Sequence, residues 1–233
     1  MIIIIESIGQ FYSIADRFFF SSVREGGISA INYAQILVSL PISIIAIPLS
    51  TALFPKISDD LYGTSSIGIE LTLKDSIKVT LLIFIPVFYI FNFFGIDIIS
   101  LLLQRGKFNA GDSYTTAEVL RYLNLGLLFY AIYAIFNKVL YSAKLIRQLL
   151  YITLIGMMIK IFLNFYLVKL MNFNGLALST SISYIFFFIA SVSVIVKRFQ
   201  FNWVLISSFE FIILFSNGLV AFIITEVLFN LFD

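Results

Sequence analysis

The chain of 233 residues contains no cysteine and no histidine. The lack of both residues excludes disulfide bonds, thiolate nucleophiles, Cys/His zinc sites and any Ser-His-Asp catalytic arrangement. We therefore expect no metal site and no cofactor. Charge is also scarce, because Asp, Glu, Lys and Arg make up 12% of the residues, whereas a soluble domain carries roughly 25%.

What remains is overwhelmingly apolar. Hydrophobic residues account for 61% of the chain, 27 of them phenylalanine, and the mean hydropathy is +1.04. This amount would overfill a soluble core, so the surplus must face hydrocarbon. The net charge of +2, spread over short segments, gives no reason to expect a nucleic-acid partner.

The sequence predicts an all-α, polytopic transmembrane helix bundle of about seven spans. A spanning helix needs about 20 mostly apolar residues, and lipid offers no partner for unpaired backbone groups. The predicted spans are residues 1–22, 31–54, 76–103, 116–143, 148–170, 175–196 and 204–230. The third span is too long for one straight crossing, so we expect a bend near Asn92 and Gly95.

Several short motifs occur in the order and spacing of a known family. They are Ile14-Ala15-Asp16-Arg17, Ser29-Ala30-Ile31-Asn32-Tyr33-Ala34-Gln35, Leu49-Ser50-Thr51-Ala52-Leu53-Phe54-Pro55, Arg105-Gly106-Lys107-Phe108, Tyr141-Ser142-Ala143-Lys144 and Gly175-Leu176-Ala177-Leu178-Ser179-Thr180. Through them the chain resembles the MurJ/MviN lipid II flippases of bacteria. These belong to the MOP flippase superfamily, which also includes MATE exporters and polysaccharide flippases.

The resemblance implies one lobe of a MATE/MurJ-like two-lobe transporter. Family members combine two six-helix lobes with two final helices. Residues 1–200 would form the second lobe and residues 201–233 an additional transmembrane helix, with the first lobe absent. The implied location is the bacterial inner membrane. The implied partners are a lipid-linked substrate, membrane lipids and a separate chain that supplies the first lobe.

Arginine is the residue that the resemblance connects with substrate. In the family a cationic cavity holds the pyrophosphate of lipid II, and the planar fork of arginine suits phosphate oxygens. Typical members carry one such arginine after the Asn-Tyr-Ala motif, where this chain has Ile36. Arg17 is then the candidate substrate-binding residue. Its alternative role is a helix-end side chain that reaches the membrane interface.

A polar cluster of Asp16, Lys160, Asn164 and Thr180 is the second hypothesis. The resemblance implies that some family members bind sodium between the first, fifth and sixth spans, with an acid at the position of Asp16. A carboxylate within the bilayer costs at least ~2.5 kcal/mol and needs a partner. Lys160 and Asn164 are four residues apart and share a helix face. We hypothesise that the Lys160 ammonium takes the place of the cation; alternatively, Lys160 bends toward an interface and Asp16 lies near the rim.

Two prolines mark a candidate hinge in the second span. Pro41 and Pro48 are seven residues apart, so an α-helix would place both on nearly one face. Each removes a backbone hydrogen bond and clashes with the preceding turn. A hinge would suit alternating access, and a static kink that improves packing is the alternative.

The expected function is therefore part of a membrane flippase that translocates lipid-linked peptidoglycan precursor by alternating access, incomplete alone. The alternatives are a non-transporting structural or regulatory membrane subunit, a remnant, or another polysaccharide or drug exporter of the superfamily. A membrane glycosyl- or acyltransferase would present a cluster of acids or bases in a sizeable loop. Within residues 55–75 the candidate acids Asp59, Asp60 and Glu70 have no clear partner, so we expect no enzyme.

Overall fold

The structure is a computed structural model that describes residues 2–24, 26–62 and 66–199, together with residues 216–218, 220, 223, 224 and 227. In this part of the chain every element is helical. The elements are α1 (Ile2–Ile14), the 3-10 helix η1 (Ala15–Ser22), α2 (Gly27–Pro41), the π-helix η2 (Ile42–Ala46), α3 (Ile47–Tyr62), α4 (Ser66–Phe93), α5 (Gly95–Leu103), α6 (Ala110–Ser142), α7 (Ile146–Met171) and α8 (Phe173–Phe199).

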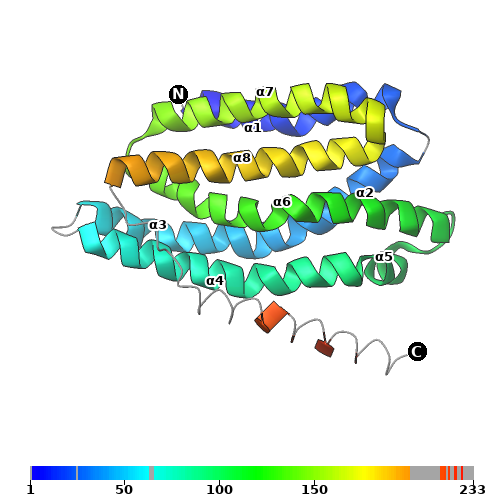
Figure 1. The fold of residues 1–233 in the computed structure, drawn as a ribbon, viewed down its shortest axis with the longest axis horizontal. Helices are drawn as coiled ribbons and strands as arrows, with labels where there is room; N and C mark the ends of the chain where they lie inside the picture. The colour runs from blue at the N-terminus through cyan, green and yellow to red at the C-terminus, as the bar shows by residue number, and fades with distance from the viewer. Residues whose placement is uncertain are drawn as a thin grey trace.

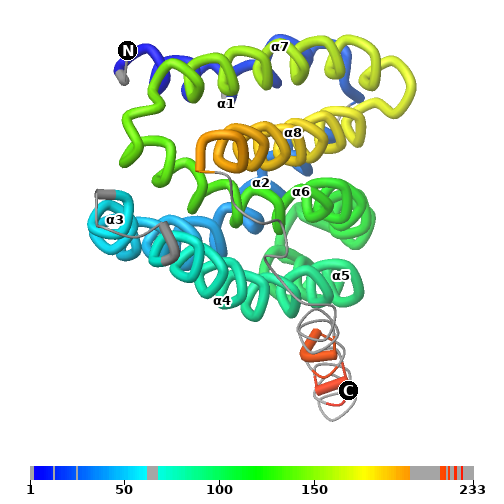
Figure 2. The backbone as a smooth tube through the Cα atoms, turned by 60° about the vertical axis from the view of Figure 1, so that its left-hand side comes forward, coloured from blue at the N-terminus to red at the C-terminus, as the bar shows by residue number. Residues whose placement is uncertain are grey.

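The long helices lie side by side along one axis, with α6 at the centre (Figure 1). Helix α6 packs against α8, α2, α4 and α3, while α8 lies between α6 and α7, and α1 packs on α7 (Figure 2). In the most apolar window of α6, 61% of the residues are buried, compared with 28% in α7. Helix α6 therefore forms the core, and α7 presents a wide apolar face to its surroundings.

Five helices in the described ranges are long and apolar enough to cross a membrane. They are Gly27–Leu61, Gly68–Phe93, Ala110–Ser142, Ile146–Met171 and Phe173–Phe199. The first predicted span, residues 1–22, is divided into the α-helix α1 and the 3-10 helix η1. The seventh predicted span and the additional helix at 201–233 lie outside the described residues, apart from the few positions named above. The helical membrane class is confirmed, and the count of seven spans is not.

The second predicted span differs from a simple kinked helix. Helices α2 and α3 join through the π-helix η2, which lies between Pro41 and Pro48. A π-helix makes i→i+5 hydrogen bonds and so turns less per residue than an α-helix. Pro41 is buried and Pro48 is exposed. Pro41 and Pro48 therefore differ in exposure, and η2 turns the chain between them less per residue than the predicted α-helix would.

The third predicted span breaks where the sequence indicated. Helix α4 ends at Phe93 and α5 begins at Gly95. The amide of Asn92 donates to the Phe88 carbonyl at 2.9 Å, and Asn124 of α6 donates to the same carbonyl at 2.8 Å. The bend is thus fixed to the central helix.

Close packing between α6 and α8 sets the position of α8. A Cβ atom at Gly126 would lie 2.6 Å from Ser181 Cα, so only glycine fits there. The Gly126 N–H donates to Ser181 Oγ at 3.1 Å. Small residues that let helix backbones approach are typical of membrane helix pairs. Ser179 and Thr180 directly precede Ser181 in α8. The contact therefore holds them against α7 and α1.

The connections alternate between two ends of the bundle, which predicts a labelling pattern. Gln104 follows α5 at one end, and Gln148 lies in the first turn of α7 at the other (Figure 1). Met158 lies mid-way along α7 and is 70% exposed. Because the chain has no native cysteine, a single introduced cysteine is the sole target for a membrane-impermeant maleimide. We expect Gln104→Cys and Gln148→Cys to react from opposite faces of the membrane and Met158→Cys from neither. Rapid labelling of Met158→Cys would show that this face of α7 meets water.

Candidate functional site

A buried ion pair joins the 3-10 helix η1 to helix α7. Lys160 Nζ of α7 lies 3.0 Å from Asp16 Oδ2 of η1, and both side chains are buried. Two opposite charges withdrawn from water need further hydrogen bonds to be tolerated. The environment of the pair therefore decides whether it can exist in the bundle.

The surrounding groups supply hydrogen bonds to both members of the ion pair. Lys160 Nζ also donates to the Tyr12 carbonyl at 3.2 Å and lies 4.0 Å from the centre of the Tyr12 ring, a distance at which a cation is attracted to the ring face. Asn164 Nδ2 donates to Asp16 Oδ1 at 2.9 Å, and Gln35 Nε2 donates to Asp16 Oδ2 at 3.4 Å. Each carboxylate oxygen therefore has at least one donor.

The α8 side of the cluster supplies serine and threonine. Ser179 Oγ donates to Asn164 Oδ1 and lies 2.8 Å from the Leu176 carbonyl. Thr180 Oγ1 donates to the Leu176 carbonyl at 3.0 Å, while the Thr180 carbonyl accepts from the Tyr12 hydroxyl at 3.4 Å. Thr180 thus joins the cluster through its backbone carbonyl, and Ser179 adds a side-chain contact to Asn164.

Helix periodicity explains why Lys160 and Asn164 face the interior of the bundle. The buried residues of α7 are Leu149, Ile152, Gly156, Lys160, Asn164 and Val168. They recur every three or four positions and form one stripe, so Lys160 and Asn164 replace two apolar members of a core face. At the other side of the pair, α1 tightens into the 3-10 helix η1 at Ala15, and Ala15 and Asp16 are its buried residues.

The pair borders a cavity of about 210 Å³. Asp16, Lys160, Thr180, Gln35 and Ile42 line it, together with Tyr12 and Tyr184. Ile42 is the first residue of η2. The polar cluster, the cavity and the π-helix are therefore contiguous.

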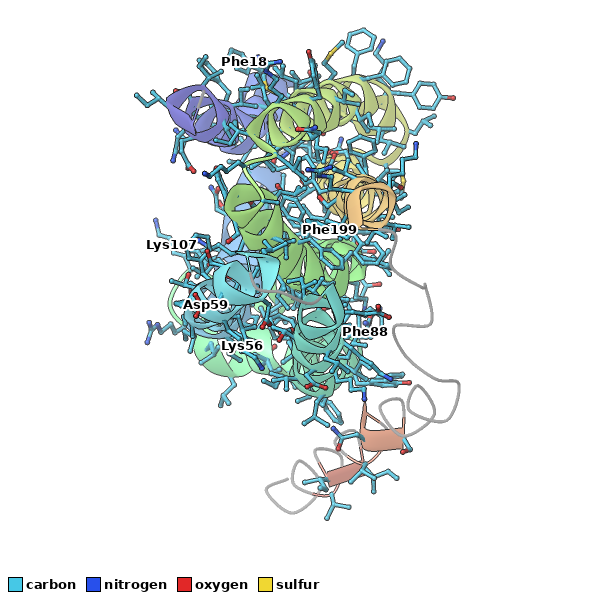
Figure 3. All side chains as sticks on the ribbon, turned by 90° about the vertical axis from the view of Figure 1, so that its left-hand side faces the viewer. Phe18, Lys56, Asp59, Phe88, Lys107 and Phe199 are labelled. Atoms are coloured by element: carbon cyan, nitrogen blue, oxygen red, sulfur yellow. The ribbon has the colours of Figure 1, made fainter. Side chains whose placement is uncertain are left out.

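Arg17 is not part of this cluster. It follows Asp16 in η1 but is exposed, and Phe18 beside it is 76% exposed at the edge of the bundle (Figure 3). Arg17 thus faces outward while Asp16 faces the interior. The structure brings together Asp16, Lys160 and Asn164, and it leaves Arg17 on another surface.

No three acidic side chains converge to hold a metal ion in the ranges that the structure covers. In the Asp16 cluster, the positive charge is supplied by Lys160. The sequence interpretation missed Tyr12, Gln35 and Ser179. Tyr12 lies four residues before Asp16, one helical turn away, and this spacing is the signal that could have identified it.

Comparison with known proteins places this arrangement in a family. The family model described as lipid II flippase MurJ matches residues 1–231. The chain belongs to the lipid II flippase MurJ family. It is therefore a multi-pass membrane protein of that family, as the motifs indicated.

Individual relatives agree with the family match. The chain is 32% identical over 178 residues to a probable lipid II flippase MurJ of Borreliella burgdorferi, covering 76% of the chain and 35% of that relative. It is 27% identical over 224 residues to the corresponding protein of Buchnera aphidicola, covering 96% and 43%. The chain thus spans less than half the length of these relatives.

A solved structure shares the fold. The chain superposes on a lipid II flippase MurJ in an inward closed conformation with a TM-score of 0.77 and 24% identity. The match covers 99% of the chain and 53% of that protein. The helix arrangement described above is therefore the MurJ fold over about half of a family member.

The ion pair of this MurJ-family chain predicts a strong coupling between two substitutions. Removing one partner leaves a buried, uncompensated charge, which costs about 3–5 kcal/mol. We expect Lys160→Met and Asp16→Asn each to lower the free energy of unfolding by about this amount. The double variant should recover most of the loss, because the introduced amide oxygen still accepts from Asn164 and no charge remains. Urea unfolding of the detergent-solubilised chain, followed by helical circular dichroism, measures the effect.

The matched control is Lys169→Met, which removes an exposed lysine from the same helix whose Nζ lies 4.2 Å from the centre of the Phe165 ring. Loss of an exposed contact of this kind lowers stability by about 0.5–1 kcal/mol, well below the effect expected at Lys160. Additive losses in the double variant would contradict a direct interaction between Asp16 and Lys160.

Proposed function

We propose that the chain is one lobe of a flippase that moves a lipid-linked peptidoglycan precursor across the bacterial inner membrane. The observation that carries this proposal is the family match over residues 1–231, whose relatives are named as probable lipid II flippases. Transport of this kind needs no bond to be made or broken by the protein. A polar interior and a helix that can bend are sufficient, and the buried polar cluster and the helix interrupted by η2 are the features that support the proposal.

In this proposal residues 1–200 are the second six-helix lobe and residues 201–233 contribute an additional helix. A lobe needs an opposing lobe to enclose a headgroup, because alternating access rocks one repeat against the other. We propose that a separate chain supplies it.

We propose that η2 and its flanking prolines form the hinge. Pro41 and Pro48 lack the backbone N–H that would lock the helix, and η2 between them is a π-helix. Such segments are frequent at functional sites. Because Ile42 lines the cavity beside Asp16, bending at η2 would change the shape of the polar interior.

We propose that Arg17 contacts the substrate diphosphate at the open side of the lobe. Its exposure at the edge of the bundle supports this role, since an arginine buried in the lobe could not meet a headgroup held between two lobes. A guanidinium makes bidentate hydrogen bonds to phosphate oxygens. Arg17 and arginines of the opposing lobe would share the charge of the diphosphate.

The transport proposal predicts that activity needs two pieces. We expect vesicles that contain this chain together with the first lobe of a relative to move a fluorescent lipid-linked precursor between leaflets. Vesicles with either piece alone should not move it. A membrane-impermeant reductant that bleaches the outer leaflet measures the transferred fraction. Failure of the paired vesicles, or full activity of the chain alone, would contradict the proposed division.

In the paired vesicles, Arg17→Gln should slow transfer about tenfold or more, because a hydrogen bond between charged groups contributes about 1.5–3 kcal/mol. The matched control is Arg147→Gln, which changes an exposed arginine at the start of α7. Pro41→Ala should slow transfer without loss of helical content.

We further propose that Lys160 acts as a tethered cation in the place of a bound sodium ion. Its ammonium meets oxygen atoms of Asp16 and Tyr12 at 3.0 and 3.2 Å, the kind of oxygen donors that bind hard cations. The tether would hold α1 and η1 against α7 at any sodium concentration. Transport by this lobe would then be independent of sodium binding at this position.

The tethered cation predicts that Lys160→Gln creates a dependence on sodium. We expect the variant to be less stable than the parent chain in potassium and to recover stability in sodium. At about 100 times the dissociation constant, a bound ion contributes about 2.7 kcal/mol. Thermal unfolding in matched sodium and potassium chloride provides the readout, with Lys169→Gln as control. Equal behaviour of Lys160→Gln and the parent chain in both salts would refute the idea.

A further inference from the structure

A second cavity of about 320 Å³ lies among α1, α6, α7 and α8. The residues that matter for its chemistry are Glu6, Tyr130, Tyr133, Asn137, Tyr141 and Tyr184. Tyr12 and Tyr184 line this cavity as well as the smaller one beside Asp16. Glu6 and Gly9 are exposed, so the cavity opens along α1. We call it the tyrosine cavity.

Aromatic rings form a continuous lining on one side of the tyrosine cavity. The ring centres of Tyr130 and Tyr184 are 4.4 Å apart, and those of Tyr12 and Tyr184 are 6.2 Å apart. Tyr133 stacks on Phe187 at 5.2 Å. The faces of such rings carry partial negative charge and attract cations.

The tyrosine cavity offers several hydrogen-bond acceptors beside its tyrosine hydroxyls, which can both donate and accept. Glu6 contributes a carboxylate, whose Oε1 accepts from the Tyr141 hydroxyl at 3.5 Å. Asn137 Nδ2 donates to the Tyr133 hydroxyl at 3.3 Å, while Asn137 Oδ1 is buried and has no hydrogen-bond partner among the described residues. The Thr153 hydroxyl donates to backbone carbonyls of its own helix. The remaining lone pairs of these groups can each accept from a bound donor.

No lysine or arginine lines the tyrosine cavity within the described residues. Lys138 lines a neighbouring cavity of about 150 Å³ that shares Glu6, and no ion pair joins Lys138 to Glu6 within the described part of the chain. A diphosphate would be repelled by Glu6 and would find no cation here. The charge pattern therefore selects against the anionic part of a lipid headgroup and in favour of a cation.

We propose that the tyrosine cavity binds a primary ammonium group of an organic amine. The ammonium carries three donors, which match the Glu6 carboxylate, Asn137 Oδ1 and the hydroxyl oxygens, while its positive charge faces the tyrosine rings. The carbon chain of the amine lies against Ile5, Ile8 and Phe187, which also line the cavity. The proposed amine site does not depend on transport, so it can be tested separately from the proposed flippase activity.

Gly9 offers a direct probe of occupancy. It lines the tyrosine cavity, and a Cβ atom added there meets no other atom within 4 Å. Because the chain has no native cysteine, Gly9→Cys can be modified alone by a neutral methanethiosulfonate reagent. The experiment compares the rate of modification with n-butylammonium, with 1-butanol, and with neither, at equal ionic strength in detergent.

We expect n-butylammonium to slow modification of Gly9→Cys at millimolar concentration and 1-butanol to have no such effect. Adding Glu6→Gln should weaken the protection about tenfold, since loss of the charged acceptor removes a hydrogen bond of about 1.5 kcal/mol. The matched control is Glu118→Gln, a glutamate of α6 that does not line the tyrosine cavity. Gln148→Cys, outside the cavity, should react at one rate in every solution.

Equal protection by the amine and the alcohol, or protection that survives Glu6→Gln unchanged, would overturn the proposal. If the Glu6→Gln variant does not fold, the proposal is tested by the Gly9→Cys chain alone, through the comparison of the amine with the alcohol. A second arm uses a short lysyl peptide with a free ε-amine and its acetylated form. Protection by the free peptide would show that the amine can belong to a larger molecule, whereas protection by butylammonium alone would assign the site to small amines.

Discussion

The structure depends on one electrostatic constraint. An aspartate and a lysine that are both buried in an apolar bundle must meet, because neither charge is tolerated alone. Asp16 and Lys160 meet at 3.0 Å, 144 residues apart in the chain. Their contact joins η1, which follows the short first helix, to the buried face of α7.

The polar interior follows from this contact. Tyr12 separates the tyrosine cavity from the Asp16–Lys160 pair and contacts Lys160 with both its carbonyl and its ring. On the other side of the pair, Gln35 and Ile42 connect it to η2. Acceptors, an ion pair and a π-helix are thus contiguous in the interior of the bundle. Because Ile42 of η2 lines the same cavity as Asp16, a movement at η2 would change the surroundings of the ion pair.

The sequence predicted the parts of the fold that depend on local composition. Long apolar runs identified α6, α7 and α8, and Asn92 and Gly95 located the break between α4 and α5. The spacing of Lys160 and Asn164 placed them on one face, and the cost of a buried carboxylate indicated a partner for Asp16. The family resemblance named the helices that had to come together.

Other features could not be read from the sequence because they arise from packing between distant segments. The side-chain contact of Ser179 with Asn164 depends on the position of α8, which packs closely on α6 at Gly126. The π-helix η2, between Pro41 and Pro48, has no signal in the spacing of the two prolines. Glu6 has no charged neighbour within several residues in the sequence, and only the fold surrounds it with tyrosines from α6 and α8.

The most direct test of this account is the distance between the two charged groups in a lipid bilayer. Solid-state nuclear magnetic resonance on chain labelled at Lys160 Nζ and Asp16 Cγ can measure the separation of these two atoms. We expect a direct contact, in line with the 3.0 Å between Nζ and Oδ2. A separation well beyond the ~4 Å limit of an ion pair would contradict it.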